Sequence, residues 1–394
     1  MIHPLLQTYG PFDGWMILLV IASVSIGFFT YQVQKATRLV LIGAPDSRFD
    51  SWGPRIKEFI VGWLGQKKVL RDKVAGTMHV LMFWGFLMLA SDMFDLATAN
   101  YFSGEILPEL VVGPWNGMVE LGYTMALIGC VSALVRRVAF TPEKLKGKSQ
   151  LEGNAILLLI FTITTTSFMI ESKEDPSPFW EPIGYQFSEF GLADGTVVVS
   201  YWIHMLAISV FLFLIPLSKH MHLVMAVPNV FFHDTGPAAK MRPLAMGDDG
   251  KAVPLEDLDI DSFGVSSYSQ FTWRQLIDGW SCTSCARCQD VCPAYASGKG
   301  LNPMQVIHDV RDYANEHAPL LLSGETPEET MMQRITEEAV WACTTCNACV
   351  DVCPLYIEHV PKLTDLRRNA MMETMEYPDV LNTAMGNIES ASNP

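Results

Sequence analysis

The sequence predicts an all-α protein in which a bundle of five transmembrane helices is followed by a cytoplasmic helical domain. Three observations predict this fold class. A mean hydropathy of +0.22 is high for a chain of 394 residues and indicates a membrane part. Five apolar stretches are long enough to cross a bilayer. Eight of the nine cysteines stand in two regularly spaced runs, in a region that shows no strand alternation.

The apolar stretches are judged by length, because a helix needs about 20 residues to cross a hydrocarbon core of about 30 Å. They cover roughly residues 15–33, 74–96, 111–135, 155–171 and 197–225. A segment after Pro54 places apolar residues at helical spacing among charged ones, which predicts an interfacial helix and not a sixth span. The first stretch lacks a basic flank and a clear cleavage site, so we expect it to remain as an anchor.

Lysine and arginine are distributed unequally between the loops. Residues 35–73 carry nine of them and residues 136–148 carry five, whereas residues 92–112 carry none. Basic loops stay on the cytoplasmic side. We therefore expect a plasma-membrane protein with its N-terminus outside the cell and its cysteine domain in the cytoplasm. Thiols stay reduced in that compartment, so the cysteine usage predicts the same orientation.

Negative charge is concentrated in the last part of the chain. Residues 231–394 contain 24 Asp and Glu against 11 Lys and Arg. Nucleic-acid binding needs a basic surface, so this composition argues against it. We expect redox proteins or small molecules as partners instead.

Ionisable residues inside apolar stretches indicate function. His79 lies about one turn into the second stretch and His222 near the inner end of the fifth. This pair is predicted to bind haem b axially from neighbouring helices at one depth; the alternative is a pair of hydrogen-bonded structural histidines. His204 is 18 residues, or five helical turns, before His222, which predicts the same face at the opposite depth. Three interpretations of His204 stay open: a second haem ligand, a quinone contact or a structural role.

Each cysteine run has the form Cys-x2-Cys-x2-Cys-x3-Cys-Pro. Three cysteines at this spacing can bind one [4Fe–4S] cluster while the fourth, directed away by proline, reaches a second cluster. The predicted ligands are Cys282, Cys285, Cys288 and Cys353 for one cluster, and Cys343, Cys346, Cys349 and Cys292 for the other. The less favoured alternative is that each run closes its own cluster. A zinc site gives no role to the third Cys or to the Cys-Pro pair.

The chain between the two runs reads as helical. Asn302-Pro303 and Thr326-Pro327-Glu328-Glu329 have the form of helix starts, so we expect an α-helical ferredoxin-type domain. The predicted organisation is a transmembrane cytochrome b-like domain in residues 1–226, a linker in 227–270 and the two-cluster domain in 271–394. Cys130, in the third stretch, is predicted to be a buried free thiol.

Two parts of the chain carry a family resemblance. The histidines in "AGTMHVLMFWGFLML" and "IPLSKHMH" resemble those of the five-span γ subunit of respiratory nitrate reductase and of the cytochrome b subunit of membrane-bound heterodisulfide reductase. The runs "CTSCARCQDVCP" and "CTTCNACVDVCP", with "NPMQVI" between them, look like the iron–sulfur part of heterodisulfide-reductase-like oxidoreductases. Fusions of these parts resemble electron-transfer-flavoprotein:menaquinone oxidoreductases.

The resemblance implies a quinone-linked oxidoreductase, or a subunit of one. Electrons would pass between a cytoplasmic partner such as an electron-transfer flavoprotein, two clusters, haem b and menaquinone. The alternative is a conduit subunit of a larger respiratory complex. Two departures matter: the nitrate reductase subunit has two histidines in its second span where this chain has only His79, and the related fusions continue into two CCG domains. The chain ends about where these would begin, so we expect them on another subunit or on a longer chain.

Overall fold

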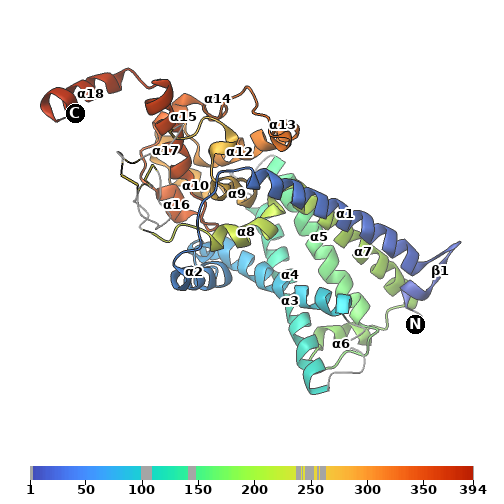
Figure 1. The fold of residues 1–394 in the computed structure, drawn as a ribbon. Coiled ribbons are helices and arrows are strands. Elements are labelled where there is room, and N and C mark those ends of the chain that lie inside the picture. Colours follow the sequence, from blue (N-terminus) through green and yellow to red (C-terminus); the bar gives the residue numbers. More distant parts are fainter. Residues whose placement is uncertain are drawn as a thin grey trace. The chain divides into compact units, whose positions relative to one another are not determined.

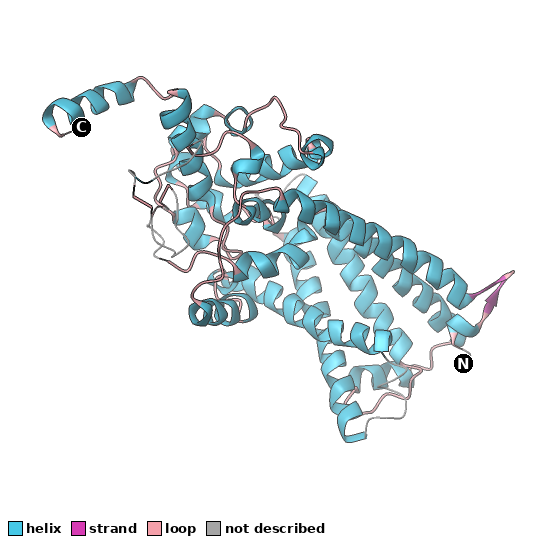
Figure 2. Cartoon of the chain, viewed as in Figure 1, coloured by secondary structure: helices cyan, strands magenta, loops and turns pink. Residues whose placement is uncertain are grey.

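The computed structural model describes residues 3–98, 109–140, 148–236, 241, 243–244, 253–254, 257 and 263–393. These residues are mostly helical (Figure 2), which confirms the predicted fold class. The strands they contain form a short antiparallel hairpin of β1 (Thr8–Tyr9) and β2 (Phe12–Asp13). The chain divides into two compact units, which are described separately. Unit 1 is Met1–Val33 with Gln66–His220, and unit 2 is Gln34–Gly65 with Met221–Pro394.

Unit 1 is a helical bundle. After a 3₁₀ turn (Pro4–Leu6), its helices are the first part of α1 (Gly14–Leu41), α3 (Lys73–Thr98), α4 (Glu109–Ala139), α5 (Lys148–Glu171), α6 (Pro182–Glu189) and α7 (Asp194–Leu217). Within it α3 packs on α4, α4 on α5 and α5 on α7 (Figure 1). Five helices in the described part are long and apolar enough to cross a membrane, which agrees with the five predicted stretches.

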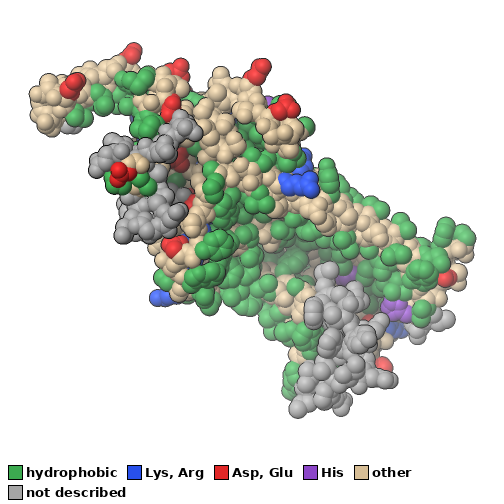
Figure 3. All heavy atoms as spheres, viewed as in Figure 1, with side chains coloured by type: hydrophobic (Ala, Val, Ile, Leu, Met, Phe, Trp, Pro, Cys, Tyr) green, Lys and Arg blue, Asp and Glu red, His purple; other side chains and the backbone are tan. Residues whose placement is uncertain are grey.

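The core of unit 1 lies where α4, α5 and α7 meet. It contains Cys130, Ile156, Leu157, Ile160, Phe211 and Ile215. The thiol of Cys130 is fully buried and donates a hydrogen bond to the Leu157 carbonyl oxygen at 2.9 Å, as expected for a thiol that packs as a small apolar group. By contrast, Leu19, Val20 and Val24 of α1 are exposed, and Figure 3 shows hydrophobic side chains along this helix. An outward apolar surface suits contact with lipid.

The fifth membrane helix is shorter than predicted. It ends at Leu217 instead of continuing to residue 225, and Ser218 is extended with φ −128° and ψ 175°. Pro216 lies inside the last turn, where it removes one helical hydrogen bond. After the helix end, the Ser218 hydroxyl accepts the N–H of His220 at 3.1 Å. His222 begins a separate helix, α8 (His222–Phe231). The inference that His204 and His222 share one helix face is therefore wrong.

Unit 2 consists of short helices. They are α2 (Trp52–Glu58) with a π-helical turn (Phe59–Leu64), α8, α9 (Trp273–Ser281), α10 (Arg287–Asp290), α11 (Pro293–Ala296), α12 (Pro303–Glu316), α13 (Ala318–Ser323), α14 (Met331–Ile335), α15 (Glu337–Ala342), α16 (Ala348–Val352), α17 (His359–Asn369) with a π-helical turn (Ala370–Thr374), and α18 (Val380–Ala391). The segment after Pro54 is helical as predicted; its place at a membrane interface stays a prediction.

Only one of the two predicted helix starts is correct. The Asn302 side-chain oxygen accepts the backbone N–H of Met304 at 3.0 Å, with Pro303 in the first turn of α12. The start predicted at Thr326 is wrong, because that segment is a loop and α14 begins after Thr330. Thr330 and Gln333 form reciprocal side-chain to backbone hydrogen bonds of 3.2 and 2.8 Å, and this capping box fixes the start of α14.

The predicted linker, residues 227–270, begins inside α8, which continues to Phe231. Most of its middle lies outside the described residues, including the acidic residues Glu256, Asp259 and Asp261. Its end is ordered against α17: the Val265 N–H donates to the Asp365 carbonyl oxygen at 3.0 Å.

Gly264 provides a test of this packing. Its φ is +71°, and a Cβ atom there would stand 2.2 Å from the Asp365 carbonyl oxygen. Gly298 has φ +78° but nothing within 4 Å of its Cβ position. Both Gly→Ala variants meet the left-handed penalty of about 1 kcal/mol, but only Gly264→Ala also meets backbone, at a further cost of about 1–3 kcal/mol. We expect a clearly larger fall in apparent Tm for Gly264→Ala; equal falls would show that the collision is relieved.

Candidate iron–sulfur centres

The two cysteine runs adopt the same local structure. Each begins where a helix ends: Cys282 caps α9, and Cys343 caps α15. At the end of the first run, Cys292 is extended and Pro293 opens α11; at the end of the second, Cys353 is extended after α16. A residue before proline is disfavoured in helical conformation, so the Cys-Pro pair turns the fourth thiol away from the first three.

Four non-glycine residues in the runs have left-handed backbone. They are Ser284 (φ 55°), Ala286 (φ 61°), Thr345 (φ 55°) and Asn347 (φ 58°), at the second and fourth positions after the first cysteine of each run. Such conformations cost roughly 1–2 kcal/mol per residue and concentrate at functional sites. They turn the backbone around the cysteines, and the Thr345 N–H points to the Cys343 thiol at 3.4 Å. The sequence contained no glycine to signal these turns.

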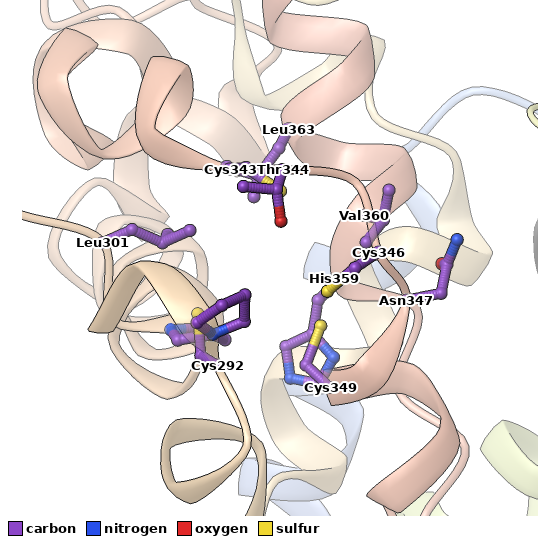
Figure 4. A pocket seen from close by; sticks show the side chains of 12 residues that line it. Cys292, Leu301, Cys343, Thr344, Cys346, Asn347, Cys349, His359, Val360 and Leu363 are labelled. Atoms are coloured by element: carbon purple, nitrogen blue, oxygen red, sulfur yellow. The ribbon is translucent and has the colours of Figure 1, made fainter. Parts of the chain in front are cut away.

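Cysteines from both runs line one pocket. Its wall contains Cys343, Cys346 and Cys349 of the second run together with Cys292 of the first (Figure 4). Much of the remaining wall is apolar, formed in part by Leu301, Val360 and Leu363. Burial, and then the charges of Cys343, Cys292 and Cys346, raise the pKa of Cys349 to about 12, as expected for four cysteines that line one pocket.

The other four cysteines are also neighbours. Burial, and then the charges of Cys353, Cys282 and Cys285, raise the pKa of the Cys288 thiol. Cys282 and Cys353 pack in one buried group with Ile307 and Ile357. This set again combines three cysteines of one run with the last cysteine of the other.

The donor sets fit [4Fe–4S] clusters. Each offers four sulfur ligands in a largely apolar surrounding, and such thiols need a metal to become thiolates. Among the described residues, no three His, Cys, Asp or Glu side chains converge as a single metal ion requires, and a cubane is larger than one ion. The sets are those of the crossed assignment, which they support over the alternative that each run closes its own cluster.

The two sets differ in exposure. Cys346 and Thr344, two positions before it, are exposed, so the set that contains Cys346 reaches the surface of unit 2. In the other set Cys282, Cys288 and Cys353 are all buried.

A buried ion network joins the helices that carry the two runs. Arg274 and Asp278 of α9 are 2.8 Å apart, and Lys362 of α17 contacts the same carboxylate. Glu358 pairs with Arg48 at 3.0 Å. Burial alone would raise the pKa of Asp278, but Lys362 and Arg274 outweigh it and lower that pKa to about 2. The network fixes α9, which leads into the first run, against α17, which follows the second.

Two histidines that the sequence interpretation overlooked lie beside the cysteines. The His308 Nε2 atom is 3.6 Å from the Cys282 sulfur and 3.0 Å from the Ser284 hydroxyl. His359 lines the pocket of Cys349, and burial lowers its pKa to about 4. Neither follows a ligand spacing that a sequence could show.

The three histidines predicted at membrane depth lie in three different helices. His79 is in α3 of unit 1, where its ring stacks on that of Phe83 with the ring centroids 6.4 Å apart. His222 begins α8 of unit 2. Because they belong to different units, their pairing stays a prediction. The His204 Nδ1 atom is 3.2 Å from the Ile163 carbonyl oxygen and 3.0 Å from the Thr166 hydroxyl. A carbonyl oxygen can only accept a hydrogen bond, so the contact with Ile163 is a hydrogen bond in the tautomer that carries its proton on Nδ1.

Comparison with known proteins identifies the cysteine region. Residues 274–354 match the model of the 4Fe-4S dicluster domain. With the five helices of the described part that are long and apolar enough to cross a membrane, this match indicates a membrane-anchored iron–sulfur protein.

The chain is also similar to several known proteins, in two cases well beyond the cysteine region. The chain is 29% identical to "EtfAB:quinone oxidoreductase" of Syntrophomonas wolfei, over 96% of this chain and 58% of the relative. It is 27% identical to "Probable iron-sulfur-binding oxidoreductase FadF" of Bacillus subtilis, over 96% and 59%. It is 31% identical to one subunit of the ferredoxin:CoB-CoM heterodisulfide reductase of Methanosarcina mazei, over 26% and 53%. The chain thus spans less than two thirds of the length of these relatives. No solved structure matches.

Proposed function

We propose that this chain passes electrons between a cytoplasmic redox protein and a quinone pool, through two [4Fe–4S] clusters and haem b. The observation that supports it best is the pair of crossed cysteine sets. The described part of the chain also contains five helices long and apolar enough to span a membrane. The name of the Syntrophomonas relative supports an electron-transfer flavoprotein as the partner and a quinone, such as menaquinone, as the membrane substrate.

The exposure of the cysteines suggests the order of transfer in unit 2. The set with Cys346 reaches the surface, so a soluble partner exchanges electrons there. The buried set of Cys282, Cys285, Cys288 and Cys353 takes the inner position. The clusters supply one-electron carriers, and the protein excludes water from the inner one and fixes both sets through the backbone turns of the two runs.

His79 and His222 are the proposed axial ligands of the haem. For His204 we keep the three roles: ligand of a second haem, quinone contact or structural residue. The hydrogen bond from Nδ1 to the Ile163 carbonyl is the kind of contact that orients a ligating imidazole. With the basic loops inside, the N-terminus is outside and the clusters are cytoplasmic.

Spectra and activity of the purified full chain test this function. We expect a b-type haem spectrum that His79→Ala and His222→Ala each abolish, with the iron of the clusters unchanged. We also expect a reduced electron-transfer flavoprotein to reduce the clusters, and a menaquinone analogue to reoxidise them. Haem and cluster signals without quinone reactivity would instead support a conduit subunit, and absence of a b-type spectrum would contradict the haem assignment.

A further inference from the structure

His359 is the first residue of α17, six positions after Cys353. Its side chain is almost fully buried, with 2% of the residue exposed. Its Nδ1 atom has no hydrogen-bond partner among the described residues. A buried polar atom without a partner costs about 1–3 kcal/mol, so a histidine at this position needs an explanation.

The surroundings of the ring indicate where the partner is. His359 forms part of the wall of the pocket lined by Cys292, Cys343, Cys346 and Cys349 (Figure 4). Its nearest pocket neighbours along α17 are Val360 and Leu363, which have no polar side-chain atom. The Ile357 backbone also lies near the ring, but it makes no hydrogen bond with Nδ1. The group that those four thiols bind is therefore the hydrogen-bonding partner left for this atom.

We propose that His359 donates a hydrogen bond to the cluster held by Cys292, Cys343, Cys346 and Cys349, and thereby raises the reduction potential of that cluster. This rests on the cluster assignment of the proposed function. A neutral imidazole has one N–H donor. Reduction adds negative charge to a cluster, and a donor directed at its sulfur atoms stabilises the reduced form, which is how hydrogen bonds tune such potentials.

His359 is thus a positioning and tuning residue and not a ligand. It acts on the cluster whose cysteine Cys346 is exposed. A higher potential at this cluster makes it a better acceptor for electrons from a soluble donor.

Redox-titrated EPR of the full chain tests the proposal. The wild-type chain first shows whether two clusters are present; if it does not, the proposed function fails independently of His359. In His359→Leu we expect the oxidised-to-reduced ratio of one cluster, measured at its wild-type midpoint, to rise about tenfold, which is about 59 mV for a one-electron couple. The other cluster should not change. His359→Asn keeps an N–H donor, so its cluster potential should lie close to that of the wild-type chain.

His317→Leu is the matched control, because His317 lies in the same unit and pairs with Glu329 at 3.1 Å. It should move neither potential. Two unshifted potentials in His359→Leu, or equal shifts of both clusters, would overturn the proposal. If His359→Leu does not assemble its two clusters, double-resonance spectra of the chain labelled with ¹⁵N-histidine test the proposed hydrogen bond instead. A nitrogen coupling on one cluster that disappears in His359→Asn supports the proposal, and no such coupling overturns it.

Discussion

Replacing Cys292 with alanine is expected to remove the cluster of the second cysteine run, although Cys292 belongs to the first run. Cys292 lines the pocket of Cys343, Cys346 and Cys349, and loss of one of four thiolates destabilises a cubane. We expect iron to fall from about eight to about four atoms per chain. Iron and acid-labile sulfide analysis of the purified chain measures this. Cys130→Ala removes a buried thiol of unit 1 and should leave iron unchanged.

Double variants identify which cysteines share a cluster. Cys292→Ala with Cys346→Ala should lose no more iron than either single variant, because both residues line one pocket. Cys353→Ala with Cys346→Ala should lose nearly all iron, because Cys353 lies with Cys282, Cys285 and Cys288. The reverse pattern would show that each run closes its own cluster.

Replacing Lys362 with methionine is expected to destabilise unit 2 strongly. The Lys362 ammonium and the Asp278 carboxylate are both fully buried, and Asp278 would keep only Arg274 as a charged partner. Removal of one member of a buried ion network typically costs about 3–5 kcal/mol, because the opposite charge stays buried. We expect a markedly lower apparent Tm for the loss of cluster absorbance on heating.

Glu316→Gln is the matched control for this variant. Glu316 is exposed, and its partner Arg334 also pairs with Glu329 at 3.1 Å. Exposed ion pairs contribute little, so the melting transition should hardly change. Similar effects of Lys362→Met and Glu316→Gln would mean that the buried network does not stabilise the fold.

The fold class and the cysteine pattern could be predicted because both depend on local rules. Five stretches of sufficient length stand out by their apolar composition, and the described residues contain five such helices. The two runs have identical spacing, and the Cys-Pro pairs alone predict the crossed assignment, which stays a proposal. Asn302-Pro303 likewise has a local capping function, and the structure shows it.

Other features depend on interactions that no local pattern reveals. The helix ends after Leu217 at Ser218, whose backbone is extended and whose hydroxyl accepts the His220 N–H. The apolar residues that follow gave no sign of this break in the sequence. Lys362 and Asp278 are 84 positions apart, so their pairing exists only in the folded chain. His359 reaches the pocket through the direction in which α17 begins, which its spacing from Cys353 does not indicate.

The number of clusters in the purified full chain tests the proposed electron path most directly. We expect about eight non-haem iron atoms and about eight acid-labile sulfides per chain. EPR of the reduced chain should show two [4Fe–4S] signals that broaden each other, because α10, which contains Cys288 of one set, packs on α16, which contains Cys349 of the other. About four irons per chain, a single isolated signal, or zinc in place of iron would contradict the proposal.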